Sequence, residues 1–201
     1  KDVHRAARAY RRVVDIEPSR ESLDRFASLL ERARQFDEEA QVLERLVQDH
    51  GRDDDISLRL AAAYGNAGKV ERAREELERA VAGGGGSPRI REVLASIYRA
   101  AGAWSALAEL FEAEAQDASS DELKVTRLRE AAQVYVDHLQ RPEAAVGLLE
   151  RAAELKPEDL DSALVLAAAL RAAARLDDAR EQLAKLLAGF GTRKPKERAL
   201  V

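Results

Sequence analysis

The residues most suggestive of chemistry are four consecutive glycines, Gly83–Gly86, followed by Ser87 and Pro88. Glycine-rich loops cradle phosphates when they follow a strand in patterns such as G-x-G-x-x-G or G-x-x-x-x-G-K-[ST]. Neither pattern fits, because no lysine follows the tract and no strand is predicted before it. The tract therefore predicts a turn between two helices. Gly83 would cap the end of the first helix, Ser87 would be the N-cap of the second, and Pro88 would be its first helical residue.

Histidines and carboxylates could supply acid–base or metal chemistry, but their spacing does not favour it. His4, His50 and His138 lie far apart, and none has the second histidine that a His-Glu-x-x-His zinc site requires. The acidic runs 53–55 and 177–178 fall near predicted helix starts, where carboxylates complement the helix dipole. The chain has no cysteine, which excludes disulfides and thiolate chemistry. We therefore predict no enzyme activity, no catalytic residue, no metal site and no cofactor.

The elements that would position any site come from an internal repeat. Residues 60–70, LAAAYGNAGKV, align with residues 94–104, LASIYRAAGAW, at a period of 34. Both halves of each unit carry apolar residues at spacings of three, four and seven, which predicts a helix, a tight turn and a second helix. Gly68 and Gly102 are predicted to end the first helix of their units. Small residues recur where the helices must approach closely, at Ala27, Ala61, Ala95, Ala132 and Ala167.

The repeat resembles a known family. Its period, the small-x-x-aromatic pattern of the first helix and the Ala-x-x-x-Leu-x-x-Ala pattern of the second, best seen at Ala73, Leu77 and Ala80, resemble tetratricopeptide (TPR) repeats. The departures concern the second-helix alanine and the turn glycine, which are replaced at Glu39, Leu107, Arg34 and Ala174. The resemblance, to bacterial TPR-like helical repeat domains, implies an all-α fold: a right-handed α-solenoid of stacked antiparallel helix pairs, or TPR-like superhelix.

The register divides a single solenoid of residues 1–201 into repeats. We expect the second helix of a truncated repeat, five full repeats and the start of a further one, at 1–19, 20–53, 54–87, 88–124, 125–159, 160–193 and 194–201. In the fourth full repeat, a capping box from Ser119 to Glu122 predicts an early start of the first helix. Trp104 falls in a slot that other repeats fill with apolar residues, which predicts that it packs between helices.

TPR solenoids commonly bind peptides or partner helices on a concave face lined by their first helices. By resemblance, the peptide-binding groove consists of Asp24, Arg25, Ser28, Leu58, Arg59, Ala62, Asn66, Glu92, Val93, Ser96, Arg99, Arg129, Glu130, Gln133, Leu164, Val165, Ala168 and Arg171. One TPR class clamps a chaperone's C-terminal carboxylate with lysine and asparagine at set places on these helices. Those places hold Asp24 with Ser28, Leu58 with Ala62, and Glu92 with Ser96, which excludes that class.

The predicted function is a non-catalytic protein–protein interaction scaffold whose protein or peptide partner the sequence does not name. Two alternatives stay open: a regulatory or oligomerisation arm of a larger enzyme or signalling protein, with self-association through terminal repeats, and an RNA-binding helical repeat. The formal net charge of −4 opposes nucleic-acid binding, and no apolar run is long enough to span a membrane. We expect a bacterial, cytoplasmic protein, and a chain that begins at Lys1 without methionine predicts a fragment of a longer one.

Overall fold

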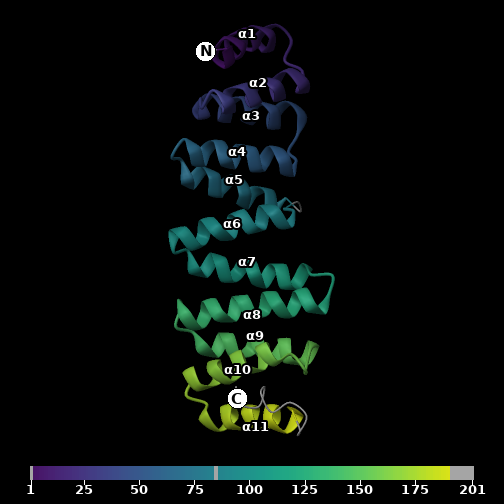
Figure 1. Cartoon of the computed structure of the whole chain (residues 1–201), viewed down its shortest axis with the longest axis vertical. Coiled ribbons are helices and arrows are strands. Elements are labelled where there is room, and N and C mark those ends of the chain that lie inside the picture. The colour runs from purple at the N-terminus through teal and green to yellow at the C-terminus, as the bar shows by residue number, and fades with distance from the viewer. Residues whose placement is uncertain (1, 84–85, 191–201) are drawn as a thin grey trace. The chain divides into compact units, whose positions relative to one another are not determined.

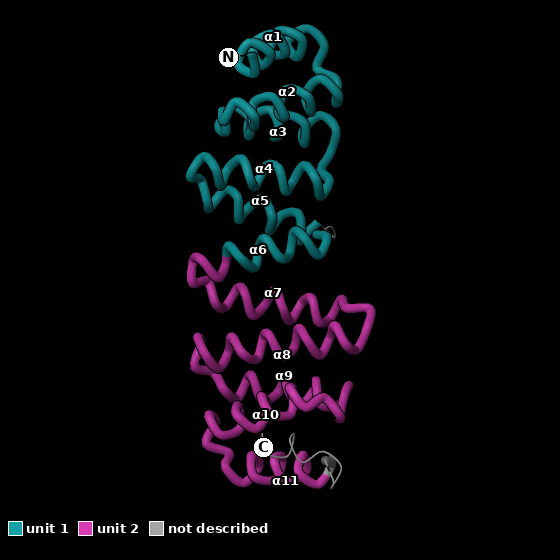
Figure 2. The backbone as a smooth tube through the Cα atoms, viewed as in Figure 1, with its two compact units in different colours: residues 1–97 teal, residues 98–201 magenta. Residues whose placement is uncertain are grey.

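The computed structural model describes residues 2–83 and 86–190, and all regular structure in these ranges is α-helical (Figure 1). The chain divides into two compact units, residues 1–97 and 98–201 (Figure 2). The helices are α1 (Asp2–Ile16), α2 (Arg20–Arg32), α3 (Phe36–His50), α4 (Asp54–Asn66), α5 (Val70–Ala82), α6 (Pro88–Ala101), α7 (Trp104–Asp117), α8 (Asp121–Asp137), α9 (Pro142–Leu155), α10 (Leu160–Ala172) and α11 (Leu176–Phe190). The unit boundary falls within α6.

Each unit contains antiparallel helices that pack on helices next to them along the chain. In unit 1, α2 packs on α3, α3 on α4, and α4 on α5; in unit 2, α8 packs on α7 and α9, and α10 on α9 and α11. We call α2, α4, α6, α8 and α10 the first helices, and α1, α3, α5, α7, α9 and α11 the second helices. This arrangement confirms the predicted all-α solenoid class.

The first helices begin at side-chain caps. In four of them, the residue before the helix accepts a hydrogen bond from the backbone N–H three residues later, which satisfies a donor that the helix leaves free. These caps are Ser19, Asp53, Ser120 and Asp159. The early start of α8 is confirmed, since α8 has 17 residues where α2, α4 and α10 have 13. The predicted cap at Ser119 was wrong by one residue, because the side chain of Ser120 binds the N–H of Leu123.

A left-handed residue forms the turn from each first helix to the second. It has a positive φ in every repeat, at Arg34, Gly68, Gly102, Gln140 and Ala174. In the turns after α2, α4, α6 and α10, the next N–H donates to the carbonyl five residues before it, at 2.8–2.9 Å, as in a helix C-cap of the Schellman type. The predicted glycine caps are confirmed, and three residues with side chains adopt the same strained conformation.

The core lies between first and second helices, and the small residues predicted there are buried. Ala27 and Ala132 are fully buried, and Ala61, Ala95 and Ala167 nearly so. Trp104 was predicted to pack between helices. In the structure, the residues at this position of the repeat differ in their exposure. Trp104 stacks on His138 at a ring distance of 3.6 Å, whereas Val70 and Leu176 in the same slot are half exposed. All three residues begin their helices, α5, α7 and α11, so this slot lies at the edge of the core.

The repeat boundaries stay a prediction. The helix α8 begins at Asp121, inside the range 88–124 that the register gave to the third full repeat. The last predicted segment, 194–201, lies outside the described residues.

Candidate protein-binding face

The three histidines lie on different helices of the described part of the chain. His4 lies on α1, His50 ends α3 and His138 caps the end of α8, where its ring stacks on Trp104. Among the residues that the structure describes, no three His, Cys, Asp or Glu side chains lie close enough to hold a metal ion.

The glycine tract leads into α6, and the backbone N–H groups of Gly86 and Ser87 bind a carboxylate of the chain itself. Gly83 caps α5 by donating to the carbonyl of Arg79, and α6 begins at Pro88, both as predicted. The N–H of Ser87 donates to Asp54 Oδ2 at 2.9 Å, and that of Gly86 lies 3.4 Å from Asp54 Oδ1. These bonds, first those from Ser87, lower the pKa of Asp54. The N–H groups of Gly86 and Ser87 are thus engaged within unit 1.

The predicted groove residues of unit 1 all lie at the surface of the first helices. They are exposed or half-buried, whereas the residues between them, such as Leu23, Ala27 and Leu60, are buried. The ten positions are Asp24, Arg25, Ser28, Leu58, Arg59, Ala62, Asn66, Glu92, Val93 and Ser96. The helical register therefore sets them on the accessible side of α2, α4 and α6.

Arg59 links two neighbouring first helices across this face. Its guanidinium, on α4, forms an ion pair with Asp24 of α2 and donates to Ser28 Oγ at 3.2 Å. It also lies 3.7 Å from Asp55 on its own helix. Arg25, next to Asp24, pairs with Glu21 at 2.7 Å. The sequence marked Arg59 as a residue that could meet a partner, and the structure adds a structural role between α2 and α4.

In unit 2 the groove residues differ between α8 and α10. On α8, Arg129 lies 3.4 Å from both Asp159 and Asp161 at the start of α10. Its neighbours are also engaged, Glu130 by Arg127 at 2.6 Å and Gln133 by Asp137 at 2.6 Å. The guanidinium of Arg99 lies over the ring of Phe111 at 5.6 Å.

The outward side of α10 is apolar for most of its length. Leu164 and Val165 are half-buried and Ala168 is exposed. The charged residues on this side, Asp161 and Arg171, lie near the two ends of the helix. Helices of soluble proteins usually carry polar residues on the side that faces water. This apolar row is therefore the part of the predicted groove best suited to contact a partner.

Two clefts on the other side, between second helices, escaped the sequence analysis. The α4 cleft, of about 420 Å³, is lined by Glu44, Val47, Gln48, Arg52, Leu60, Tyr64, Arg72, Glu75, Glu76 and Arg79. The α10 cleft, of about 470 Å³, is lined by Glu150, Ala153, Glu154, Leu166, Leu170, Arg175, Asp178, Glu181, Gln182 and Lys185. They match in register, since Glu44, Leu60 and Glu75 correspond to Glu150, Leu166 and Glu181.

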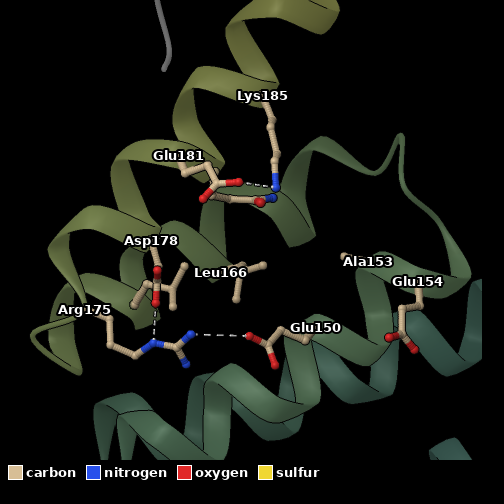
Figure 3. A pocket seen from close by; sticks show the side chains of 10 residues that line it. Glu150, Ala153, Glu154, Leu166, Arg175, Asp178, Glu181 and Lys185 are labelled. Atoms are coloured by element: carbon tan, nitrogen blue, oxygen red, sulfur yellow. Dashed lines mark hydrogen bonds and ion pairs between the residues drawn. The ribbon is translucent and has the colours of Figure 1, made fainter.

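The α10 cleft is bordered by charged pairs above an apolar floor (Figure 3). Arg175 donates to Asp178 at 2.6 Å and lies 3.8 Å from Glu150. Lys185 pairs with Glu181 at 2.9 Å. The hydrogen bond to Asp178 raises the pKa of Arg175, which keeps the guanidinium charged. These exposed pairs are each worth little in stability.

The α4 cleft holds a buried charge. Glu76 is 1% exposed and forms ion pairs with Arg52 and Arg79, while Ser57 donates to it at 3.1 Å. At the same register, Val42, Leu110 and Leu148 are apolar and buried. A glutamate in an apolar slot was the signal that could have indicated this cluster.

A recurrent tyrosine contact also joins first and second helices. The Tyr64 hydroxyl binds Glu44, and the Tyr135 hydroxyl donates to Glu112 Oε1 at 2.8 Å. Burial, followed by the nearby carboxylate of Glu112, raises the pKa of Tyr135 to about 12. Both contacts hold successive repeats together.

Comparison with known protein families finds one match, and it lies in unit 1. Residues 30–97, all within unit 1, match the family model described as tetratricopeptide repeat. Within this segment the chain is similar to tetratricopeptide repeats. Among curated proteins, no relative matches. In the described part of the chain, no helix has the length and apolar character needed to cross a membrane.

Solved structures share the fold at low sequence identity. A structure described as MamA AMB-1 is 20% identical with a TM-score of 0.52, over 90% of this chain and 97% of MamA. A MamA mutant is 19% identical with a TM-score of 0.51, over 87% and 95%. A human IFIT1 dimer with m7Gppp-AAAA is 21% identical with a TM-score of 0.41, over 98% of this chain and 47% of IFIT1. The two MamA structures support the helical-repeat fold of this chain.

Proposed function

We propose that this protein is a non-catalytic interaction scaffold that binds a peptide or a partner helix on the outward side of its first helices. The observation that carries the proposal is the apolar row Leu164, Val165 and Ala168 on α10, which lies at the surface. An apolar helix side of this kind fits the apolar residues of an extended peptide or an amphipathic helix. The charged groove residues around it would set the orientation of the partner.

The test compares two alanines of unit 2 that are both exposed. Ala168 lies on the proposed face of α10, and Ala144 lies on the second helix α9. A photo-crosslinking residue at position 168 in the whole chain, exposed to lysate of the source cells, should yield one dominant polypeptide adduct. The same residue at 144 should not. The substitution Ala168→Arg should then abolish capture of that polypeptide by the whole chain, whereas Ala144→Arg should leave it unchanged.

Two results would contradict the proposal. Equal adducts at positions 168 and 144 would show non-specific capture. Full binding by the Ala168→Arg variant would show that the partner binds elsewhere.

The oligomerisation alternative is tested on the same protein without a partner. It predicts a sedimentation coefficient that rises with concentration, whereas the scaffold proposal does not require one.

A further inference from the structure

Glu39 on α3 occupies a slot that the other second helices fill with a small or apolar residue. In α5, α7, α9 and α11 the equivalent residues are buried: Ala73, Leu107, Ala145 and Ala179. Glu39 is itself only 3% exposed, on a helix that packs against both α2 and α4. A carboxyl group at such a place is hard to ionise, because burial removes the water that would solvate its charge.

The groups around Glu39 do not satisfy its charged form. Its Oε2 atom is buried and has no hydrogen-bond partner. From α2, the carboxylate of Glu31 repels it, and from α4 the guanidinium of Arg59 attracts it. Burial first, and then Glu31, raise the pKa of Glu39 to about 7, while Arg59 offsets part of the rise. The side chain therefore changes charge close to neutral pH.

Of the groups that shift the pKa of Glu39, only Arg59 favours the charged carboxylate. Arg59 already has other partners. It forms an ion pair with Asp24 and donates to Ser28, both on α2. When Glu39 ionises, the same guanidinium faces a second carboxylate, which is buried and less well solvated than Asp24. The side chain of Asp24 is 48% exposed, so water can replace Arg59 there at lower cost.

We propose that Glu39 is a proton-operated switch in unit 1. With its proton, the neutral carboxyl leaves Arg59 bound to Asp24, and α2, α3 and α4 pack fully. Without it, the buried carboxylate draws Arg59 away from Asp24 and loosens the link between the first helices α2 and α4. Asp24, Ser28 and Arg59 belong to the proposed binding face, so a pH-dependent face follows, and this last step alone rests on the proposed function.

The first experiment follows both side chains in the whole chain by NMR between pH 5 and pH 9. The Glu39 carboxyl carbon should titrate with a midpoint near 7, and the Arg59 Nε resonance should shift with the same midpoint. A Glu39 that titrates in the range of an exposed glutamate overturns the proposal. An Arg59 resonance that does not follow Glu39 overturns the link to α2.

The second experiment measures unfolding by urea at pH 5 and pH 8. Because folded Glu39 keeps a proton that the unfolded chain releases, its contribution to stability is present at low pH and is lost as pH rises through 7. The folding equilibrium constant should fall roughly 50-fold more in the wild type than in Glu39→Gln. Glu39→Leu, which copies Leu107, gives a second uncharged variant if glutamine packs poorly.

Glu21→Gln is the matched control, because the side chain of Glu21 is 74% exposed. This variant should keep the pH dependence of the wild type. Equal pH dependence in the wild type, Glu39→Gln and Glu39→Leu overturns the proposal. Neither experiment uses a partner, so failure of the proposed function would leave both results unaffected.

Discussion

The α4 cleft and the α10 cleft occupy the same place in their repeats, yet their charges are arranged differently. In the α4 cleft the charge points inward, with Glu76 buried between Arg52 and Arg79. In the α10 cleft the equivalent of Glu76 is Gln182 and that of Arg52 is Glu158. The α4 cleft thus has both the buried carboxylate of Glu76 and the arginine Arg52, and the α10 cleft has neither. An unpaired buried charge is costly, which explains why the two positions differ as a pair.

The largest expected effect comes from breaking that pair. Arg52→Ala leaves Glu76 buried with only Arg79 and Ser57, and should lower the free energy of unfolding by about 2–3 kcal/mol, measured by urea denaturation at pH 7. Glu158→Ala at the equivalent position should change it by less than about 0.5 kcal/mol. The double variant Arg52→Glu with Glu76→Gln, which copies unit 2, should lose less than Arg52→Ala alone. Equal losses in the two clefts would refute the comparison.

The next effect concerns Asp54, whose equivalent beside the α10 cleft is Leu160. Asp54→Ala removes the acceptor of the Gly86 and Ser87 N–H groups, and should cost about 1–2 kcal/mol at pH 7. Asp161→Ala, on an exposed side chain of α10, should cost less than about 0.5 kcal/mol.

The same variant has a defined pH dependence. The hydrogen bonds lower the pKa of Asp54 in the folded state, so its contribution is present above the ordinary value of 3.8 and is lost as pH falls through the lowered one. The difference between wild type and Asp54→Ala should therefore shrink on acidification from pH 5 to pH 2. A difference that grows on acidification would show that the carboxylate has another role.

A third pair of substitutions exchanges the left-handed turn residues that follow α4 and α10. Gly68 and Ala174 are equivalent and have φ values of 76° and 60°. Gly68→Ala should cost about 1 kcal/mol, and Ala174→Gly should stabilise by a similar amount, because a side chain is strained in this region. Gly65→Ala, inside α4 with open space at its Cβ, should be stabilising. Thermal unfolding measures all three, and the same sign for Gly68→Ala and Gly65→Ala would contradict the assignment.

The smallest effect is expected at the rim of the clefts. Arg72→Asp copies Asp178 and removes a cation that lies 5.8 Å from the Tyr64 ring and 4.0 Å from Glu44. Because the Arg72 side chain is 60% exposed, the free energy of unfolding should fall by only about 0.5 kcal/mol. The fall should be larger at low salt, where the repulsion between the new carboxylate and Glu44 is less screened. A loss as large as that of Arg52→Ala would mean that the rim, and not the buried pair, holds the α4 cleft together.

The sequence predicted the helices and turns well, because these depend on local periodicity. The repeated glycines predicted two of the left-handed turns, and the register placed Arg34 and Ala174 in the same position before the structure showed their positive φ. The cap of α8 shows the limit of local patterns. Ser119 and Ser120 offer the same hydroxyl one residue apart, and the backbone conformation that selects Ser120 is not written in the pattern.

The candidate site was predictable as a set of surface positions but not in its contacts. The groove residues follow from the buried stripe of each first helix, since the remaining sides must face outward. The partners of Arg59, and the buried pair of Arg52 and Glu76, join residues of different helices. Such pairs depend on how helices pack, and a period of 34 residues carries no information about them. Whether the groove binds a partner stays a prediction.

The stack of Trp104 on His138 has a practical consequence for all of these measurements. Trp104 is the only tryptophan of the chain, and both rings belong to unit 2. Indole fluorescence therefore reports the unfolding of unit 2 alone, while circular dichroism sums the helices of both units. A urea titration followed by both signals should separate the two transitions if the units unfold independently. The chain thus carries an internal spectroscopic label that distinguishes its halves without any added dye.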